Sequence, residues 1–145
     1  MRKKKAGDIR RPGRCLFRKF RISDMPQIMS IEKEAFPDPL APLVVLFLSA
    51  MTEFIVVVKQ GRVVGFLSLG YENRTLRHIY RIAFSSSCRG QGLGGIILSR
   101  YVKNGCSVMT NATNKGSLRF YEKNGFRETK RIKKKSKSLV YLLRS

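Results

Sequence analysis

Metal ligands and redox-active residues are scarce in this sequence. Among its 145 residues there are one histidine and three cysteines. An odd number of cysteines without paired spacing indicates neither a disulfide framework nor a zinc site, and a single histidine argues against a histidine-rich metal centre. We therefore expect no bound metal and a reduced, cytoplasmic protein.

Acidic residues and long apolar runs are also scarce. Nine Asp and Glu stand against 30 Lys and Arg, which gives a formal net charge of +21. Such an excess favours polyanionic partners, such as nucleic acid, ribosomes or phosphorylated small molecules, or it is a soluble basic surface and nothing more. The most apolar run, residues 40–51, is interrupted by Pro42 and falls short of the roughly 20 residues that span a bilayer. We expect no membrane segment.

What is present suits one folded domain. The hydrophobic content is 43%, and a chain of this length matches a typical domain. Residues 1–14 carry seven basic residues, one acid and Pro12-Gly13, so they are predicted to form a flexible basic arm. That arm is either a solvated tail or a contact for RNA or the ribosome. Residues 15–145 are predicted to form the domain.

The hydrophobic pattern predicts an α+β chain. An N-cap at Ser23-Asp24 and a turn at Gln60-Gly61-Arg62 mark two of its boundaries. The uniformly apolar segment 44–51 is expected to be a well-buried helix. Helices are predicted at 24–36, 44–51, 92–103 and 114–123, and strands at 15–22, 54–59, 63–69, 76–84, 106–110, 126–132 and 138–143.

A glycine-rich turn joins the strand at 76–84 to the helix at 92–103. It reads Arg89-Gly90-Gln91-Gly92-Leu93-Gly94-Gly95. Glycines at alternate positions let the backbone approach a ligand, and successive N–H groups can converge on an anion at the positive end of the following helix. A diphosphate is therefore the expected ligand. The alternative is that the glycines only form a turn and bind nothing.

Two common diphosphate motifs are excluded at this turn. A Walker A loop needs Gly-Lys-Ser/Thr, which is absent. A dinucleotide fingerprint also needs an acidic residue about 20 positions after its glycines. No acid lies between Glu72 and Glu122.

At these residues the chain resembles the GCN5-related N-acetyltransferase superfamily. That superfamily's cofactor motif, Arg/Gln-x-x-Gly-x-Gly/Ala, matches 89–94, and its later block of an Asn, a helix ending in Tyr and then Gly-Phe matches 114–126. The segment 31–39 is similar to the RimI-type branch, the ribosomal-protein N-terminal acetyltransferases. The resemblance implies an α+β fold, with a mixed, mostly antiparallel sheet of six to seven strands flanked by about four helices, and acetyl-CoA as the cofactor.

The resemblance also implies roles for individual residues. Tyr121 matches the catalytic tyrosine, a phenol that stays protonated at pH 7 and can give a proton to the departing thiolate. Asn114 would bond the pantetheine amides, cap its helix, or do both. The residues implied in cofactor binding are Ile82, Ala83, Phe84, Arg89, Gly90, Gln91, Gly92, Leu93, Gly94, Gly95 and Asn114.

One position departs from the RimI-type pattern. Where that branch carries a glutamate base, five residues before the Asn, this chain has Met109, which cannot accept a proton. Another group can act through water, or an α-amine with a pKa near 8 needs little help because about a tenth of it is neutral at pH 7. Candidates for the base are Glu34, Asp38, His78 and Tyr80, and those for the acceptor site are Phe36, Asp38, His78 and Tyr80.

Three functional hypotheses follow for the chain. The first is acetylation of the N-terminal α-amine of a protein or peptide, and the second is acetylation of a small amine such as a polyamine or aminoglycoside. The third is a non-catalytic module that binds RNA or ribosomes. Seven basic residues between Arg127 and Lys137 form a predicted strand-connecting tip that would attract an acidic peptide or ribosomal RNA, or would be a solvated face.

Overall fold

The computed structural model describes residues 14–103 and 105–145. The predicted basic arm, residues 1–14, lies outside the described residues except for Arg14. In chain order the elements are β1 (Leu16–Lys19), η1 (Ile22–Asp24), α2 (Met25–Ala35), α3 (Pro42–Met51), β2 (Glu53–Lys59), β3 (Arg62–Tyr71), β4 (Arg77–Phe84), η2 (Ser86–Cys88), α4 (Leu93–Tyr101), β5 (Cys106–Asn111), α5 (Lys115–Lys123), β6 (Arg127–Lys133) and β7 (Ser138–Arg144).

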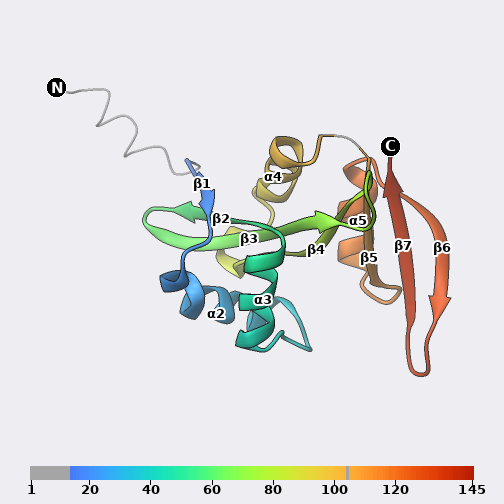
Figure 1. Cartoon of the computed structure of the whole chain (residues 1–145), viewed down its shortest axis with the longest axis horizontal. Helices are drawn as coiled ribbons and strands as arrows, with labels where there is room; N and C mark the ends of the chain where they lie inside the picture. The colour runs from blue at the N-terminus through green and yellow to red at the C-terminus, as the bar shows by residue number, and fades with distance from the viewer. Residues whose placement is uncertain (1–13, 104) are drawn as a thin grey trace.

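Seven strands form one sheet in the order β1-β2-β3-β4-β5-β7-β6. Every neighbouring pair is antiparallel except β4 and β5, which run parallel. With four α-helices in the described residues, the architecture confirms the predicted α+β fold. The parallel pair sits in the middle of the sheet (Figure 1), and the chain between its two strands contains the glycine-rich turn and α4.

Helices cover both faces of the sheet. Alternate residues of a strand point to opposite faces, and two hydrophobic clusters follow that alternation. Ile55, Leu67 and Ile79 belong to the cluster that contains the buried residues of α4 and α5. Val56 and Phe66 belong to the cluster that contains those of α2 and α3. Figure 1 shows α2 and α3 below the sheet and α4 above it. Burial on both faces explains why β2 and β3 are continuous apolar runs.

Two predictions about the N-terminal third were wrong in detail. The strand predicted at 15–22 ends at Lys19. Asp24 does not cap α2 with its side chain, because its carboxylate, which is only 4% exposed, accepts hydrogen bonds from the guanidinium of Arg18 at 2.9 Å and from the backbone N–H of Arg21 at 2.8 Å. A buried carboxylate needs such partners, and here they come from β1 and from the residue that precedes η1.

The expectation of a well-buried second helix was also wrong. In α3 only Val45 is buried, whereas Leu43, Phe47 and Met51 are 75%, 61% and 65% exposed. The helix packs against β2 and β3 along one side only. A helix that is apolar on every side carries no polar stripe to mark which face meets the sheet, so its sequence indicated more burial than the packing gives.

A buried ion pair ties α2 to β4. Glu32 is fully buried, and its two carboxylate oxygens accept hydrogen bonds from Nε and Nη2 of Arg81, each at 2.8 Å. One of these oxygens also accepts from the backbone N–H of Leu40 at 2.8 Å. The same guanidinium lies 3.6 Å above the ring of Phe36. These contacts fix the α2–α3 connection against the central strand.

We expect Glu32→Ala to lower the free energy of unfolding by about 2–4 kcal/mol, because it leaves the half-buried Arg81 guanidinium without its partner. The matched control is Glu128→Ala. Glu128 pairs with Arg131 on the exposed strand β6, and its loss should change stability by less than about 0.5 kcal/mol. Urea denaturation measures both, and equal effects of the two substitutions would contradict the role given to Glu32.

Candidate active site

The parallel strands β4 and β5 part after a short stretch of pairing. Residues 77–79 of β4 pair with 106–108 of β5, and the pairing stops at Ile79 and Val108. Beyond that point β4 pairs only with β3, and β5 only with β7. A register shift in the β3–β4 ladder leaves Tyr80 as an extra residue at the same place, which is a β-bulge. The backbone of 82–84 therefore borders an opening in the sheet.

The glycine-rich turn follows the open end of β4. Gly90 and Gly92 have φ angles of 80° and 78°, which disfavour residues with a Cβ. A Cβ at either position would meet no atom within 4 Å, so the space in front of the turn is open. Gly92 is the N-cap of α4 without any side-chain cap, and the first N–H groups of this helix are available to an anion.

Gly94 has a different role, because it sets the distance between two helices. A Cβ at this position would lie 2.6 Å from the ring of Phe120 on α5. The turn and the Asn–Tyr block are therefore packed against each other, although they are separated in sequence.

Side chains of β2 and α2, together with Arg89 of the turn itself, hold this region in place. Nζ of Lys59 donates to the side-chain oxygen of Gln91 at 2.8 Å, and Nε of Arg89 donates to the backbone carbonyl of Phe84 at 3.1 Å. The carboxylate of Glu34 accepts from the N–H and the hydroxyl of Ser86, both at 3.0 Å. Lys59 was not among the predicted site residues, and nothing in its local sequence marks it, because only the fold brings the end of β2 to the turn.

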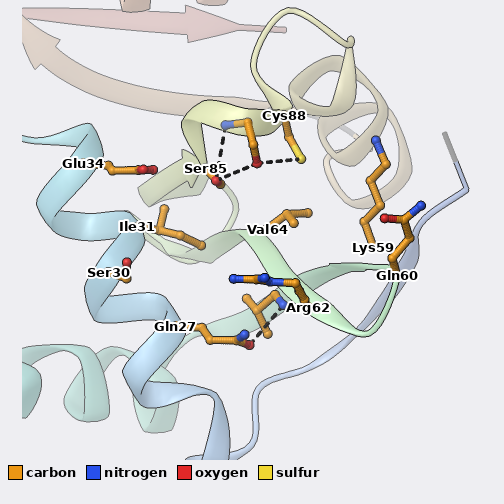
Figure 2. A pocket seen from close by; sticks show the side chains of 12 residues that line it. Gln27, Ser30, Ile31, Glu34, Lys59, Gln60, Arg62, Val64, Ser85 and Cys88 are labelled. Carbon is orange, nitrogen blue, oxygen red and sulfur yellow. Dashed lines mark hydrogen bonds between the residues drawn. The ribbon is translucent and has the colours of Figure 1, made fainter. Parts of the chain in front are cut away.

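A pocket of about 500 Å³ lies behind this turn (Figure 2). It is lined by α2, by the end of the β2–β3 hairpin with Lys59 and Arg62, and by the segment that contains Ser85 and Cys88. None of the turn's glycines lines it.

The Asn–Tyr block contains a buried hydroxyl that has no hydrogen-bond partner in the described residues. Tyr121 is 6% exposed and lies edge-on to the rings of Phe120 and Phe126. Burial raises the pKa of its phenol above the usual value. Within the described part of the chain its hydroxyl makes no hydrogen bond, which is costly for a buried polar group and indicates a missing ligand. Asn114 caps α5 by accepting from the N–H of Ser117 at 3.0 Å.

The predicted acceptor residues form two groups on the opposite face of the sheet. The first is His78 with Tyr80, whose rings are 4.7 Å apart; the Tyr80 hydroxyl donates to the carbonyl of Tyr71 at 2.9 Å. The second group gathers around Arg81, which lies over Phe36 and donates to the backbone carbonyl of Asp38 at 3.5 Å.

Three residues that sequence reasoning missed surround His78. Its Nδ1 is 2.7 Å from the hydroxyl of Ser107, which donates to the carboxylate of Glu72 at 2.6 Å. The hydroxyl of Tyr141 donates to the same carboxylate oxygen at 2.6 Å. The hydrogen bonds from Ser107 and Tyr141 lower the pKa of Glu72, and burial lowers the pKa of His78. These residues come from the β3–β4 turn, β5 and β7, so no local motif could have indicated them.

The position that departs from the RimI-type pattern lies beside this network. Met109 is opposite Tyr141 in the β5–β7 register and is 39% exposed. Of the candidates for the base, Glu34 is held by Ser86, and Asp38 is exposed on the α2–α3 connection. His78 and Tyr80 lie where β4 and β5 part.

Comparisons with known proteins assign the family. The family described as "Acetyltransferase (GNAT) domain" matches residues 51–128. An uncharacterised N-acetyltransferase of Methanocaldococcus jannaschii is 32% identical, with 82% of each chain covered. The chain belongs to the GNAT acetyltransferase family. It is therefore an acetyl-CoA-dependent N-acetyltransferase, as the resemblance predicted.

Solved structures agree with the fold of this GNAT enzyme. Ard1 from Thermoplasma volcanium is similar with a TM-score of 0.83 at 22% identity, covering 90% of this chain and 96% of that one. The ribosomal-protein-S18-alanine N-acetyltransferase from Escherichia coli is similar with a TM-score of 0.75 at 15% identity, covering 90% and 93%. Other GNAT structures of this fold contain acetyl-CoA. In the described residues no helix is long and apolar enough to cross a membrane.

The residues around the opening fit acetyl-CoA. The turn offers an open glycine surface at a helix N-terminus for the pyrophosphate, and the unpaired stretch of β4 offers backbone groups for the pantetheine amides. In the described residues the buried hydroxyl of Tyr121 has no hydrogen-bond partner.

We expect Gly92→Ala to weaken acetyl-CoA binding at least roughly tenfold, because its Cβ enters the open space of the turn and the positive φ costs about 1–2 kcal/mol. Gly61→Ala is the matched control, since Gly61 has a φ of 75° and also has no atom within 4 Å of a built Cβ. Calorimetric titration should show unchanged affinity for this control. Equal losses of affinity in both variants would mean that backbone strain alone is responsible.

Proposed function

We propose that this GNAT enzyme acetylates the N-terminal α-amine of a protein or peptide. The observation that carries the proposal is the open face of the sheet beside His78. In the described chain, α2 and α3 pack over β2, β3 and β4, while Tyr80 and Met109 remain 45% and 39% exposed. An extended peptide can lie across such a face, whereas a site for a small molecule usually encloses most of its ligand.

The comparison structures support the same acceptor class. The name of the Escherichia coli enzyme states that it acts on the alanine of ribosomal protein S18, and its fold covers nearly all of this chain. The similarity of segment 31–39 to the RimI-type branch adds to this support.

In the proposed mechanism, residues of the turn and the opening bind and orient the cofactor. Bound acetyl-CoA supplies an activated acetyl thioester. Backbone N–H groups of the turn, residues 90–95, with the guanidinium of Arg89 would hold the pyrophosphate. The backbone of 82–84 and the side chain of Asn114 would hold the pantetheine amides and orient the thioester oxygen towards a donor.

Tyr121 is the proposed general acid. Its phenol is protonated at neutral pH because burial raises its pKa, so it can donate a proton to the departing thiolate. It belongs to the hydrophobic cluster shared with α4 and α5, on the face of the sheet opposite His78. The group that protonates the thiolate and the residues that contact the amine thus lie on opposite faces of the sheet.

The β6–β7 hairpin is the proposed docking element for an anionic acceptor. Strand β6 is exposed along nearly its whole length at the edge of the sheet, and the tip protrudes beyond the other elements (Figure 1). From Arg127 to Lys137 the hairpin has seven basic residues and one acidic residue, Glu128, which pairs with Arg131. Such a surface would raise the local concentration of an acidic peptide or of a ribosome-bound chain.

We expect Tyr121→Phe to lower kcat by about 10²-fold, the lower end of the usual contribution of a general acid. The affinity for acetyl-CoA and the thermal stability should stay near wild type, because the hydroxyl makes no hydrogen bond to the described protein. Steady-state kinetics and calorimetry measure these quantities. The kcat of Tyr141→Phe, which also removes a tyrosine hydroxyl, is compared with that of Tyr121→Phe. An unchanged kcat in Tyr121→Phe would exclude Tyr121 as the general acid.

The acceptor is tested with a panel of amines. Peptides that begin with Ala, Ser or Met should be acetylated at the α-amine, with acidic peptides showing the lower KM and a loss of that advantage at high salt. Polyamines and aminoglycosides should react poorly. Mass spectrometry locates the acetyl group. Faster acetylation of a polyamine than of every peptide would favour the small-amine alternative.

A further inference from the structure

The hydrogen bonds around His78 determine which of its ring nitrogens carries the proton. Ser107 has one hydroxyl hydrogen, and its oxygen is 2.6 Å from the carboxylate of Glu72 and 3.3 Å from the backbone carbonyl of Arg77. Both neighbours are acceptors only. If that hydrogen pointed to His78, the Ser107 oxygen would face the carboxylate with lone pairs alone. Ser107 must therefore donate to Glu72, and Nδ1 of His78 must donate to Ser107.

This assignment leaves Nε2 of His78 with a free lone pair. A neutral imidazole has one N–H and one acceptor nitrogen, and within the described residues no group bonds to Nε2. The His78 side chain is 14% exposed, so it lies close beneath the open face without being in bulk solvent. Nε2 is therefore a base with a defined position, at the level of the sheet where β4 and β5 part.

Glu72 is itself a poor proton acceptor. Its carboxylate accepts hydrogen bonds from both Ser107 and Tyr141, and these bonds lower its pKa. It stays ionised at neutral pH and acts on its neighbours as an acceptor and as a negative charge. The charged and titratable groups that face His78 are Glu72 at 3.7 Å and Tyr80 on its own strand, while Tyr141 and Lys130 face it through Glu72.

We propose that Glu72 is a positioning residue, which through Ser107 holds His78 in the Nδ1–H tautomer and so makes Nε2 the general base of the reaction. The inference rests on the proposed function for the identity of the amine. It assigns to His78 on β4 the task that the RimI-type pattern gives to the residue at Met109.

The proton balance is complete with these groups. Nε2 of His78 takes one proton from the ammonium and releases it to solvent. The neutral nitrogen then forms a bond to the acetyl carbon, and the C–S bond breaks. Tyr121 donates its proton to the sulfur, and the second proton lost by the nitrogen restores the phenol through solvent. One proton is released in each turnover.

The pH dependence follows with a definite sign. His78 must be neutral to act, so kcat/KM falls as the pH drops through its pKa, which burial holds below the usual 6.5 while Glu72 partly opposes this effect. Removing the charge of Glu72 therefore lowers the pKa of His78 further and moves the acid limb of the profile to lower pH.

The test uses the fact that the chain has a single histidine. Long-range ¹H–¹⁵N correlation spectra of the full-length ¹⁵N-labelled protein contain one pair of imidazole nitrogens, and they report tautomer and pKa without any acetylation reaction. The wild type should show a protonated Nδ1 and an unprotonated Nε2. Glu72→Ala should shift the tautomer towards Nε2–H and lower kcat by about tenfold, within the usual contribution of a positioned base, with acetyl-CoA affinity unchanged.

Two further variants separate positioning from a general structural effect. Glu72→Gln keeps an acceptor for Ser107 and Tyr141 but removes the charge, so it should retain the Nδ1–H tautomer, recover most of the lost kcat and shift the acid limb to lower pH. Glu53→Ala is the matched control, because Glu53 pairs at 3.0 Å with Arg77, the neighbour of His78, and it should leave the spectrum and the profile unchanged.

The outcomes are distinct. A wild-type spectrum with the proton on Nε2, or a tautomer that Glu72→Ala does not alter, overturns the inference. If Glu72→Ala does not fold, Ser107→Ala makes the same tautomer prediction, and an unaltered Nδ1–H there also overturns it. If the spectra agree but no peptide is acetylated, the proposed acceptor fails while the positioning role of Glu72 stands, and the pH profile is then measured with the amine that reacts.

Discussion

The separation of β4 from β5 is the constraint on which the rest of the site depends. Two parallel strands in an antiparallel sheet need a crossover connection, and here that crossover contains the glycine-rich turn and α4. Because the pairing ends at Ile79 and Val108, the backbone beyond it is left without a sheet partner on that side. The same geometry thus creates the space for a ligand and places a helix N-terminus at its edge.

The opening also allows chemistry from both faces of one sheet. Tyr121 lies on the face covered by α4 and α5, in a dry cluster that keeps its phenol protonated. His78 lies on the other face, in a polar network that comes from three strands and a turn. Burial raises the pKa of Tyr121 and lowers the pKa of His78, so it favours the neutral form of both groups. The neutral form is the one that the proposed general acid and the proposed general base each need.

Polar burial elsewhere supports this arrangement. The Glu32–Arg81 pair fixes the α2–α3 connection to β4, directly after the bulge at Tyr80. Glu34 ties α2 to the start of the turn through Ser86. Helix α2 is thereby attached to the middle of β4 and to the segment that follows it. Several of the chain's few acidic residues are used in such contacts, while the basic excess is left on the surface and on the β6–β7 hairpin.

The local sequence was sufficient for most of the elements, and it predicts the cofactor side of the site. The turn at 89–95 and the block at 114–126 are contiguous motifs, and a helix N-terminus with flanking glycines has its properties wherever it is placed. The order of strands and helices likewise follows from short-range periodicity. Local pattern failed at 44–51, where a uniformly apolar helix gave no sign of which side would be covered, and at Asp24, which the fold pairs with Arg18.

Only the tertiary structure decided the acceptor side. His78, Glu72, Ser107 and Tyr141 are separated by up to 69 positions, and each alone is an ordinary polar residue of a strand or turn. Their roles come from the register that sets β4 beside β5 and β5 beside β7, and from the single hydrogen that Ser107 has to donate. The sequence alone showed that the glutamate of the RimI-type pattern is replaced by Met109. Only the packing of distant strands places His78 close by, as the proposed base.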